Sequence, residues 1–354
     1  MANERNRVYL VTGGCGFLGR HLLRVLLEKE DTASEIRLFD RLVDSRLTDH
    51  STDKVKVSVV QGDITDYSSV REAARGADVV IHSASIVDVW YKVPEAVVYS
   101  VNVTGTENVI RACVEIGIQY LVYTSSMEVV GPNVKGDHFI SKAEAEKLIL
   151  NANNTKMSGG KTLHTCALRP TGIYGEQQQL IKDFYITTVR SGGRTYNMPL
   201  EDTELGKVYA GNVAWMHLLA ARGLMERPQT VGGEAYFCYD DSPNQSYKAF
   251  NMQFMSMFNF RLVNMPLVVL KLMAVFNDLV RWLLWPVYKY TPLLNRYTLA
   301  LVSTSFSVSS DKAGRHFRYT PLYDWEECRA RTQAWVNTFP AADAAAAQHS
   351  KKDS

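Results

Sequence analysis

The first 170 residues alternate short apolar runs with segments in which apolar side chains recur at helical spacing. The runs, rich in valine, isoleucine and leucine, predict strands at 8–14, 36–40, 55–63, 78–85, 119–126 and 163–170. The segments between them predict helices at 17–30, 68–77, 101–117 and 141–153. Strands that alternate with helices are typical of a parallel sheet with helices on both faces. The pattern therefore predicts an α/β fold with a doubly wound parallel sheet.

A glycine-rich motif, TGGCGFLG at 12–19, lies between the first predicted strand and the first predicted helix. Gly13 allows the tight turn, Gly16 lets the backbone approach a pyrophosphate, and Gly19 lets helix and strand pack closely. The helix then offers free amides and the positive end of its dipole to the phosphates. We therefore predict a Rossmann-type dinucleotide site, with contacts from Gly13, Gly16, Phe17, Leu18 and Gly19.

The end of the second predicted strand indicates which dinucleotide is bound. A carboxylate at Asp40 accepts hydrogen bonds from the ribose hydroxyls and repels a 2′-phosphate, which favours NAD over NADP. Arg41 beside it is the one feature that could accommodate the extra phosphate. Ligands bind at the carboxyl edge of such sheets, so we expect Asp63 and Ile64, after the third strand, to bracket the adenine.

Composition narrows the class of function. The formal charge of +2, from 39 basic and 37 acidic residues, gives no sign of a nucleic-acid partner. The five cysteines lack CxxC spacing and predict buried free thiols rather than disulfides or a metal site; they are Cys15, Cys113, Cys166, Cys238 and Cys328. MANERNRVYLVTGG leaves no space for a signal peptide before the first strand, and residues 339–354 predict a disordered tail.

Longer stretches carry a family resemblance that covers nearly the whole chain. TGGCGFLG, GDITD, HSAS, VNVTGTENV, YTSSMEVVGP and LRPTGIYGE resemble the extended short-chain dehydrogenase/reductase superfamily. KVYAGNVAWMHLLAAR, GGEAYFCYDDSPNQSY and KAGRHFRYTPLYDWEECRARTQAWV resemble its 3β-hydroxysteroid dehydrogenases. YTSSMEVVGPN with ALRPTGIYGE is similar to the C27-steroid oxidoreductases of bile-acid synthesis in that family. The resemblance implies that NAD oxidises the 3β-hydroxyl of a Δ5 sterol and that the double bond then moves, giving the 3-oxo-Δ4 product.

The resemblance also implies roles for individual residues. In this family a tyrosine four residues before a lysine takes the hydroxyl proton, and the lysine ammonium favours the phenolate by lowering the tyrosine pKa. Lys142 matches the lysine and also a cofactor contact, while Ser126 matches the serine that steadies the substrate oxygen, with Ser125 as the alternative. The segment that packs on the nicotinamide is matched by Pro170, Ile173 and Tyr174.

The tyrosine of that pair is missing, together with a loop that helps wall the sterol cleft in relatives. GPNVKGDHFI runs straight into SKAEAEK, and no tyrosine stands between Gly131 and Lys142. His138 has the right spacing, but Ser141 and Glu144 form an S-x-x-E capping box, which predicts that the helix begins at Ser141 and leaves His138 in a loop. We therefore predict little dehydrogenase activity. The chain is either a shortened form of an active enzyme or a protein that binds NAD without turnover.

The rest of the chain predicts a smaller C-terminal substrate domain. We expect the cofactor domain to comprise residues 1–178 and 207–239, and the substrate domain to comprise residues 179–206 and 240–338. Asp240 and Asp241 could supply the base that shifts the double bond, although a carboxylate pair before Ser-Pro is also a common turn.

The segment 266–290 is the strongest candidate for membrane contact. Four polar residues, Lys271, Asn277, Asp278 and Arg281, fall on one arc of about 120° and leave a broad apolar face. This favours a helix lying in the membrane interface, with Trp282, Trp285, Tyr288 and Tyr290 at headgroup depth; burial in the substrate domain is the alternative. The resemblance implies the endoplasmic reticulum membrane with the catalytic domain facing the cytosol, and it leaves a homodimer open.

Two other classes of function compete with an active steroid dehydrogenase. One is a non-enzymatic protein that binds NAD or a sterol. The other is a different extended reductase, such as a sugar-nucleotide epimerase or a sterol decarboxylating dehydrogenase. The hydrophobic segment argues against a nucleotide sugar, and the C-terminal motifs argue against the decarboxylase.

Overall fold

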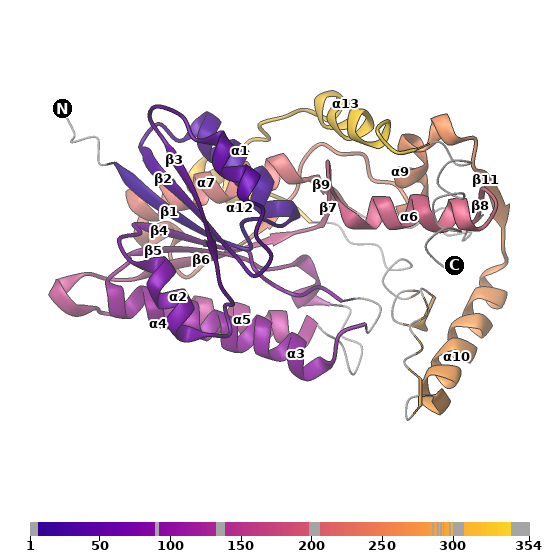
Figure 1. Cartoon of the computed structure of the whole chain (residues 1–354), viewed down its shortest axis with the longest axis horizontal. Coiled ribbons are helices and arrows are strands. Elements are labelled where there is room, and N and C mark those ends of the chain that lie inside the picture. Colours follow the sequence, from indigo (N-terminus) through magenta and orange to yellow (C-terminus); the bar gives the residue numbers. More distant parts are fainter. Residues whose placement is uncertain are drawn as a thin grey trace.

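Seven parallel strands form the central sheet of the protein in this computed structural model (Figure 1). They are β1 (Arg7–Thr12), β2 (Ala33–Asp40), β3 (Lys56–Gln61), β4 (Val79–His82), β5 (Tyr120–Thr124), β6 (His164–Pro170) and β10 (Ala235–Cys238), in the order β10-β6-β5-β4-β1-β2-β3. Because the order changes direction between β1 and β4, a ligand crevice is expected at their carboxyl ends. The predicted doubly wound parallel sheet is confirmed.

The structure describes residues 6–88, 92–131, 139–197, 206–284 and 308–340, with 287, 288, 290, 292, 294–296 and 299. The predicted tail lies almost wholly outside these residues. All five cysteines are free and buried, as predicted.

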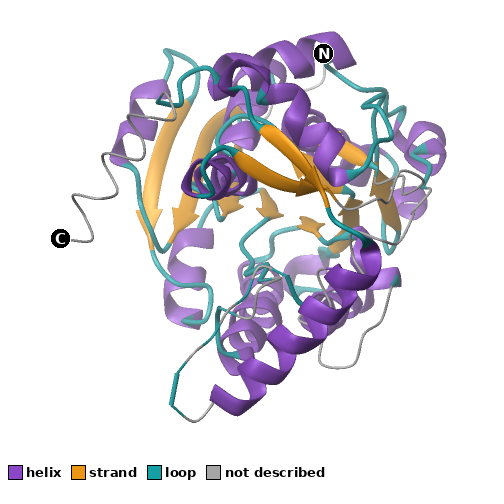
Figure 2. Ribbon diagram, turned by 90° about the vertical axis from the view of Figure 1, so that its right-hand side faces the viewer, coloured by secondary structure: helices purple, strands orange, loops and turns teal. Residues whose placement is uncertain are grey.

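Helices cover both faces of the sheet (Figure 2). One face carries α1 (Phe17–Lys29), α7 (Ala210–Glu226), α8 (Pro228–Val231) and α12 (Asp311–Phe317), and the other carries α2 (Tyr67–Ala74), α4 (Gly105–Ile116) and α5 (Phe139–Asn151). Successive strand residues point to opposite faces. Tyr9 and Val11 therefore pack in the core beneath α1 and α7, while Leu10 packs in the core beneath α2 and α4.

The helix predicted at 101–117 is part of a longer helical segment. It runs from α3 (Glu95–Tyr99) through one π-helical turn, η2 (Ser100–Thr104), into α4. The turn places the buried Asn102 side chain against the chain after β4, where its Oδ1 accepts the Ile86 amide at 2.8 Å. Its Nδ2 donates to the Ser141 hydroxyl at 3.0 Å.

The predicted start of the next helix is wrong. Helix α5 begins at Phe139, so Ser141 lies inside its first turn rather than at its N-cap. The two residues of the expected capping box bind other elements: the Ser141 hydroxyl accepts from Asn102, and the Glu144 carboxylate accepts from the Tyr99 hydroxyl at 2.8 Å. Tertiary hydrogen bonds have replaced the local cap that the S-x-x-E pattern predicted.

The remaining elements gather beyond the carboxyl edge of the sheet, on the right of Figure 1. They include β7 (Gly172–Tyr174) paired with β9 (Lys207–Tyr209), β8 (Arg194–Asn197) paired with β11 (Arg261–Asn264), α6 (Gln179–Arg190), α9 (Tyr247–Phe254), α10 (Leu267–Leu284) and α13 (Trp325–Val336). Short 3-10 turns are η1 (Ser45–His50), η3 (Met127–Val130), η4 (Ser158–Gly160) and η5 (Ser256–Phe258). An aromatic core that includes Tyr174, Tyr185 and Phe250 joins this region together. The boundaries between the cofactor domain and the substrate domain stay a prediction.

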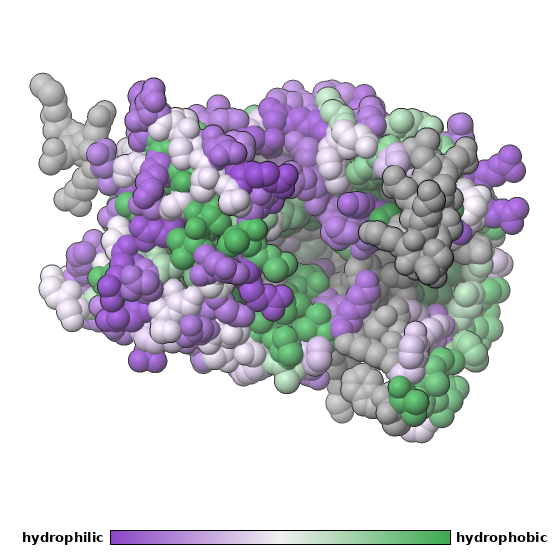
Figure 3. Space-filling view, viewed as in Figure 1, coloured by the Kyte–Doolittle hydropathy of each residue, from purple (hydrophilic) through white to green (hydrophobic). Residues whose placement is uncertain are grey.

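Helix α10 has little cover on its apolar side. Within it only Leu270 and Ala274 are buried, whereas Leu272, Phe276 and Trp282 are 66%, 62% and 72% exposed. Figure 3 shows apolar side chains gathered at the corner of the molecule that α10 forms. Among the described residues, no helix has the length and apolar character needed to cross a bilayer.

Candidate active site

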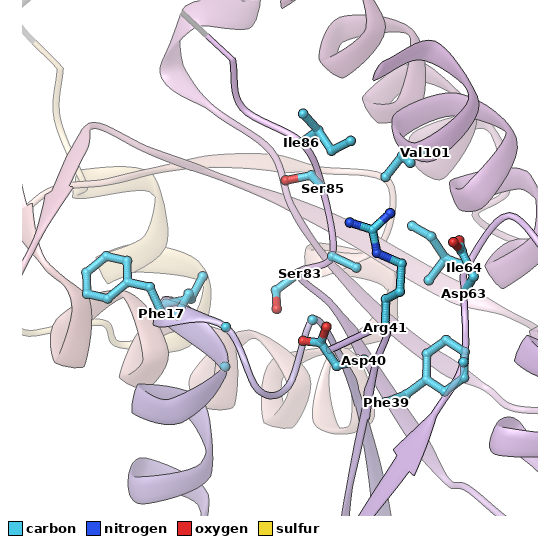
Figure 4. A pocket seen from close by; sticks show the side chains of 16 residues that line it. Phe17, Phe39, Asp40, Arg41, Asp63, Ile64, Ser83, Ser85, Ile86 and Val101 are labelled. Carbon is cyan, nitrogen blue, oxygen red and sulfur yellow. The ribbon is translucent and has the colours of Figure 1, made fainter. Parts of the chain in front are cut away.

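A cavity of about 320 Å³ opens where the sheet order reverses (Figure 4). Its wall includes the turn between β1 and α1 and the ends of β2, β3 and β4. Eight residues predicted to bind the cofactor line it: Gly13, Gly16, Phe17, Leu18, Gly19, Asp40, Asp63 and Ile64. The structure therefore brings the predicted dinucleotide contacts of the first three strands into one site.

The glycines of the motif leave no space for larger side chains. Gly13 has φ +69°, and a Cβ there would lie 2.9 Å from the backbone of Ala84. A Cβ on Gly19 would lie 2.3 Å from the carbonyl oxygen of Gly13, so helix α1 packs directly on the turn. This close approach holds the start of α1 at the cavity, where its free amides can bind phosphates. The residues present therefore fit a dinucleotide.

The predicted ribose-binding carboxylate also organises the turn. Asp40 Oδ2 accepts the Cys15 amide and Oδ1 accepts the Leu42 amide, both at 3.1 Å. These bonds orient the carboxylate at the rim of the cavity. Figure 4 shows the Arg41 side chain extending across the cavity towards the side of Ile64 and Val101. Arg41 thus lies where the adenine of a dinucleotide or a 2′-phosphate could contact it.

Sequence reasoning missed the wall formed by the segment after β4. Ser83, Ala84, Ser85 and Ile86 line the cavity, and Ser83 and Ala84 lie against the glycine turn. The Ser83 hydroxyl donates to the Thr12 carbonyl oxygen at 2.7 Å, which ties this segment to β1. The motif HSAS served only as a family match, yet its position at the end of a strand beside β1 could have identified it.

A buried histidine at the end of β4 supports the segment 83–86 that lines the cavity. One ring nitrogen of His82 lies 2.7 Å from the Thr12 hydroxyl and the other lies 3.0 Å from the Thr106 hydroxyl. Burial lowers the pKa of His82 to about 3, and the nearby Lys142 charge acts in the same direction. The ring is therefore neutral and acts as a hydrogen-bonded strut between β1, β4 and α4.

The predicted catalytic lysine lies beside the end of β5. Lys142 is 3% exposed, and its ammonium donates to the Thr124 carbonyl oxygen at 2.7 Å. Burial lowers the pKa of Lys142 to about 8, although Glu128 and Glu146 oppose the shift. His138, the residue four positions earlier, lies outside the described residues.

The two candidate serines follow β5 but differ in environment. Ser125 is buried, and its hydroxyl has no hydrogen-bond partner among the described residues. Ser126 is partly exposed and donates to the Glu128 carboxylate at 2.5 Å, while the Glu128 amide donates back to Ser126 Oγ at 3.4 Å. Ser126 is therefore the serine that a substrate could reach.

A second lysine, missed in the sequence, is placed at the same edge. Lys207 begins β9 opposite Gly172 of β7, and its ammonium would lie 2.8 Å from a Cβ on Gly172. Burial lowers the pKa of Lys207 to about 8, with the Glu128 charge opposing the shift. Its signal in the sequence was weak, because a lysine at the start of a strand is common on protein surfaces.

The predicted nicotinamide segment is only partly at the edge of the site. Pro170 ends β6 and Ile173 lies in β7, and neither lines the cavity described above. Tyr174 is 2% exposed, its hydroxyl lies 2.7 Å from Ser242 Oγ, and its ring packs on Phe250 in the aromatic core. Its position favours packing over cofactor contact.

The acidic pair considered for the double-bond shift is divided. Asp240 is 4% exposed, and its carboxylate accepts from the Tyr209 amide at 2.9 Å, the Asn212 side chain at 2.8 Å and the Ser242 amide at 3.0 Å. Asp241 is exposed at the turn. Asp240 is buried and its carboxylate already accepts three hydrogen bonds, so it stabilises the junction of β9, α7 and the turn after β10.

Comparison with known proteins adds a family to this geometry. Residues 10–270 match the 3-beta hydroxysteroid dehydrogenase/isomerase family. The chain is 51% identical to 3 beta-hydroxysteroid dehydrogenase type 7 of Mus musculus, covering 94% of this chain and 96% of the relative. It is 49% identical to the Homo sapiens protein of that name, covering 95% of this chain and 97% of the relative.

A solved structure supports the fold alone. DesIV, a dTDP-glucose 4,6-dehydratase from Streptomyces venezuelae with NAD bound, superimposes with a TM-score of 0.68 at 19% identity, covering 93% of this chain and 97% of that one. The family match and the relatives over nearly full length lead to a single conclusion. The chain belongs to the 3β-hydroxysteroid dehydrogenase/isomerase family.

Proposed function

We propose that this chain binds NAD and a 3β-hydroxy-Δ5 sterol at the carboxyl edge of its sheet. The substrate class is a C27 sterol carrying a 7α-hydroxyl, because YTSSMEVVGPN and ALRPTGIYGE resemble the C27-steroid oxidoreductases of bile-acid synthesis. The relatives named 3 beta-hydroxysteroid dehydrogenase type 7 support the 3β-hydroxysteroid part of this proposal. The observation that carries the proposal is the continuity of the site. The dinucleotide cavity contains Asp40 and the glycine turn, and Lys142 and Ser126 follow on neighbouring elements of the same edge.

Each group at this edge has a defined task in the proposal. Bound NAD supplies the hydride acceptor. Ser126 orients the substrate oxygen, and Lys142, held by the Thr124 carbonyl, supplies positive charge beside it. The preference for NAD rests on Asp40, because a fixed carboxylate repels a 2′-phosphate.

The proposal includes weak oxidation by the chain as written. No tyrosine stands between Gly131 and Lys142, so the group that would pass the hydroxyl proton to solvent is missing. General acid–base catalysis by one positioned side chain contributes roughly 10²- to 10⁴-fold to a rate. The loss of that group predicts binding of NAD and sterol with little turnover.

Two measurements on the purified full chain test this. Calorimetry with NAD should release heat, and NADH formation from a 3β-hydroxy-Δ5 sterol should stay near background. Absence of NAD binding by well-folded protein would refute the proposed site. Rapid NADH formation would refute the predicted impairment and leave the site intact. A transcript with an in-frame segment ending in tyrosine before Ser141 would identify this chain as a shortened form.

We also infer that α10 attaches the protein to the surface of the endoplasmic reticulum membrane, with the catalytic domain in the cytosol. The exposed apolar face of α10 supports this, since contiguous exposed apolar surface is typical of membrane or protein contacts. Its polar side is occupied: the Asn277 amide donates to the Leu294 carbonyl oxygen at 2.8 Å, and Asp278 pairs with Arg296 at 3.2 Å. Trp285 lies outside the described residues, whereas Tyr288 is 63% exposed.

Fractionation tests the membrane proposal. The chain should pellet with membranes and resist carbonate, and replacing 266–290 with a polar linker should release it. An unchanged distribution would count against attachment through α10. A homodimer stays a prediction, to be measured by light scattering.

A further inference from the structure

The two-stranded ribbon formed by β8 and β11 carries two arginines directly opposite each other. In its parallel register Arg194 pairs with Arg261, and the Arg261 amide donates to the Gly193 carbonyl oxygen at 2.7 Å. Adjacent strands are about 4.8 Å apart, so the two side chains leave the ribbon close together on one face. Like charges directly opposite each other destabilise a sheet. Where a local rule of this kind is broken, a functional site is the expected reason.

No described residue neutralises this pair. Both arginines are exposed, and within the part of the chain that the structure describes neither has an ion pair or a side-chain hydrogen bond. The local sequence supplies no partner either, because residues 184–200 and 242–277 include no aspartate or glutamate. The charged residues of these two segments are Arg190, Arg194, Lys248, Arg261 and Lys271. The strands and their flanks therefore carry charge of one sign.

The ribbon also continues the apolar face of α10. Only residues 265 and 266 separate β11 from the start of α10, so the two surfaces adjoin. Leu262 and Val263 of β11 are exposed, and so are Val268 and Leu272 of α10. Figure 1 places β8, β11 and α10 at the same end of the molecule, and Figure 3 shows hydrophilic side chains at that end beside the apolar corner. Unpaired positive charge thus lies next to exposed apolar side chains.

We propose that the β8–β11 ribbon binds the headgroups of anionic phospholipids, so that the protein prefers negatively charged membranes. Guanidinium groups form paired, charge-assisted hydrogen bonds with phosphate oxygens. A phosphate bound between Arg194 and Arg261 removes the repulsion of their cross-strand pairing. Basic residues beside exposed apolar ones are typical of interfacial membrane binding. The proposal rests on the proposed attachment through α10 and adds the class of lipid that this attachment selects.

The size of the ribbon favours a lipid surface over an acidic protein. Each strand is four residues long, which is small beside the 800 Å² or so that each partner contributes to a specific protein interface. One headgroup phosphate needs only the paired guanidinium groups. The neighbouring face of α10 would then contact acyl chains, for which its apolar side chains are suited.

Co-sedimentation of the purified full chain with vesicles tests this preference. Vesicles of phosphatidylcholine are compared with vesicles in which part of that lipid is replaced by phosphatidylinositol. The wild-type chain should bind the anionic vesicles roughly 30-fold more tightly, since each basic residue near an anionic surface changes affinity about fivefold. High salt should reduce the difference, because it screens exposed charges.

Three double variants assign the effect to the ribbon. Arg194→Gln/Arg261→Gln should remove most of the preference and leave binding to phosphatidylcholine unchanged. Arg194→Lys/Arg261→Lys keeps both charges and should retain most of it. Arg315→Gln/Arg318→Gln, which removes two exposed charges at the C-terminal end of α12, is the matched control and should keep the full preference.

Urea unfolding of the same samples excludes a merely structural role of the two arginines. The midpoint of Arg194→Gln/Arg261→Gln should equal or exceed that of the wild type, because the substitutions remove a like-charged pair. A lower midpoint together with weaker binding to both kinds of vesicle would show that the arginines only support the fold, and would overturn the proposal.

The other outcomes separate the proposal from the function on which it rests. Equal binding of the wild type to both kinds of vesicle would overturn the lipid preference and leave an acidic protein as the partner of the ribbon. A matching loss in the α12 control would show general attraction of a charged protein and would also overturn it. Binding to phosphatidylcholine vesicles reports attachment through α10 separately, and calorimetry with NAD reports the cofactor site.

Discussion

Helices α1 and α10 have similar apolar stripes but opposite surroundings. Helix α1 buries six residues, among them Leu22, Val25 and Leu26, against the sheet and α7. Helix α10 is longer and buries only Leu270 and Ala274. Helical periodicity therefore locates an apolar face without identifying what covers it. The sheet covers the face of α1, and in our proposal a bilayer covers the face of α10.

The two helices also differ in how they are fixed to the fold. The start of α1 is held by backbone contact at Gly13 and Gly19, where no side chain fits. The C-terminal half of α10 is held by polar contacts, from Asn277 to the Leu294 carbonyl and from Asp278 to Arg296. Substitutions at the start of α1 should therefore affect cofactor binding. Substitutions on the apolar face of α10 should affect attachment to the membrane.

A substitution in the glycine turn between β1 and α1 should have the strongest consequence. Gly13→Ala places a Cβ 2.9 Å from the Ala84 backbone at a φ of +69°, so the turn must distort and NAD binding should be lost in calorimetry. Gly76→Ala is the matched control, because Gly76 has φ +72° with nothing within 4 Å of its Cβ. The control should cost about 1 kcal/mol of stability and retain NAD binding. Equal loss in both variants would mean that backbone strain, rather than the close approach, decides binding.

A charge on the apolar face of α10 should weaken membrane binding without unfolding the protein. Leu272→Asp introduces a charge at a position that is 66% exposed, so folding should be nearly unchanged while binding to anionic vesicles falls about tenfold or more. Leu270→Asp, at a position 3% exposed, should instead destabilise the fold by several kcal/mol. Co-sedimentation and urea unfolding of the two variants measure the two effects. Vesicle binding by Leu272→Asp equal to wild type would remove α10 from the membrane proposal.

Sequence patterns predicted the cofactor half far better than the substrate half, for a physical reason. Glycine spacing, strand ends and Asp40 are tied to one backbone geometry, so the sequence alone places Gly13 and Asp63 in a common site. Lys207 and Asp240 instead depend on contacts between segments distant in the chain, which no local pattern encodes. The capping box failed at Ser141 for the same reason, because Asn102 from another helix bound the serine.

A third prediction concerns the selectivity of the cofactor half. Asp40→Ala removes the carboxylate that repels a 2′-phosphate and leaves Arg41 at the cavity. Affinity for NAD should fall about tenfold, on the scale of one charge-assisted contact, and affinity for NADP should rise. Calorimetric titration with both dinucleotides measures the ratio. An unchanged ratio would show that another residue excludes the phosphate.

The smallest expected change is in the free energy of unfolding at acid pH. It arises from buried histidines of the cofactor domain, not from the segment 266–290. Burial lowers the pKa of His82 to about 3 and that of His217 to about 4, whereas the segment 266–290 contains no histidine. Each folded-state pKa lies below the usual 6.5, so the unfolded chain binds more protons as the pH falls below that value. The free energy of unfolding should therefore fall by about 1.4 kcal/mol per pH unit for each histidine, from pH 6.5 down towards the folded pKa. Urea unfolding between pH 7 and 5 measures the slope, which His82→Gln should reduce by one such increment. If the slope were unaltered in that variant, the ring would already carry a proton in the native sheet, and the strut between Thr12 and Thr106 would need a different description.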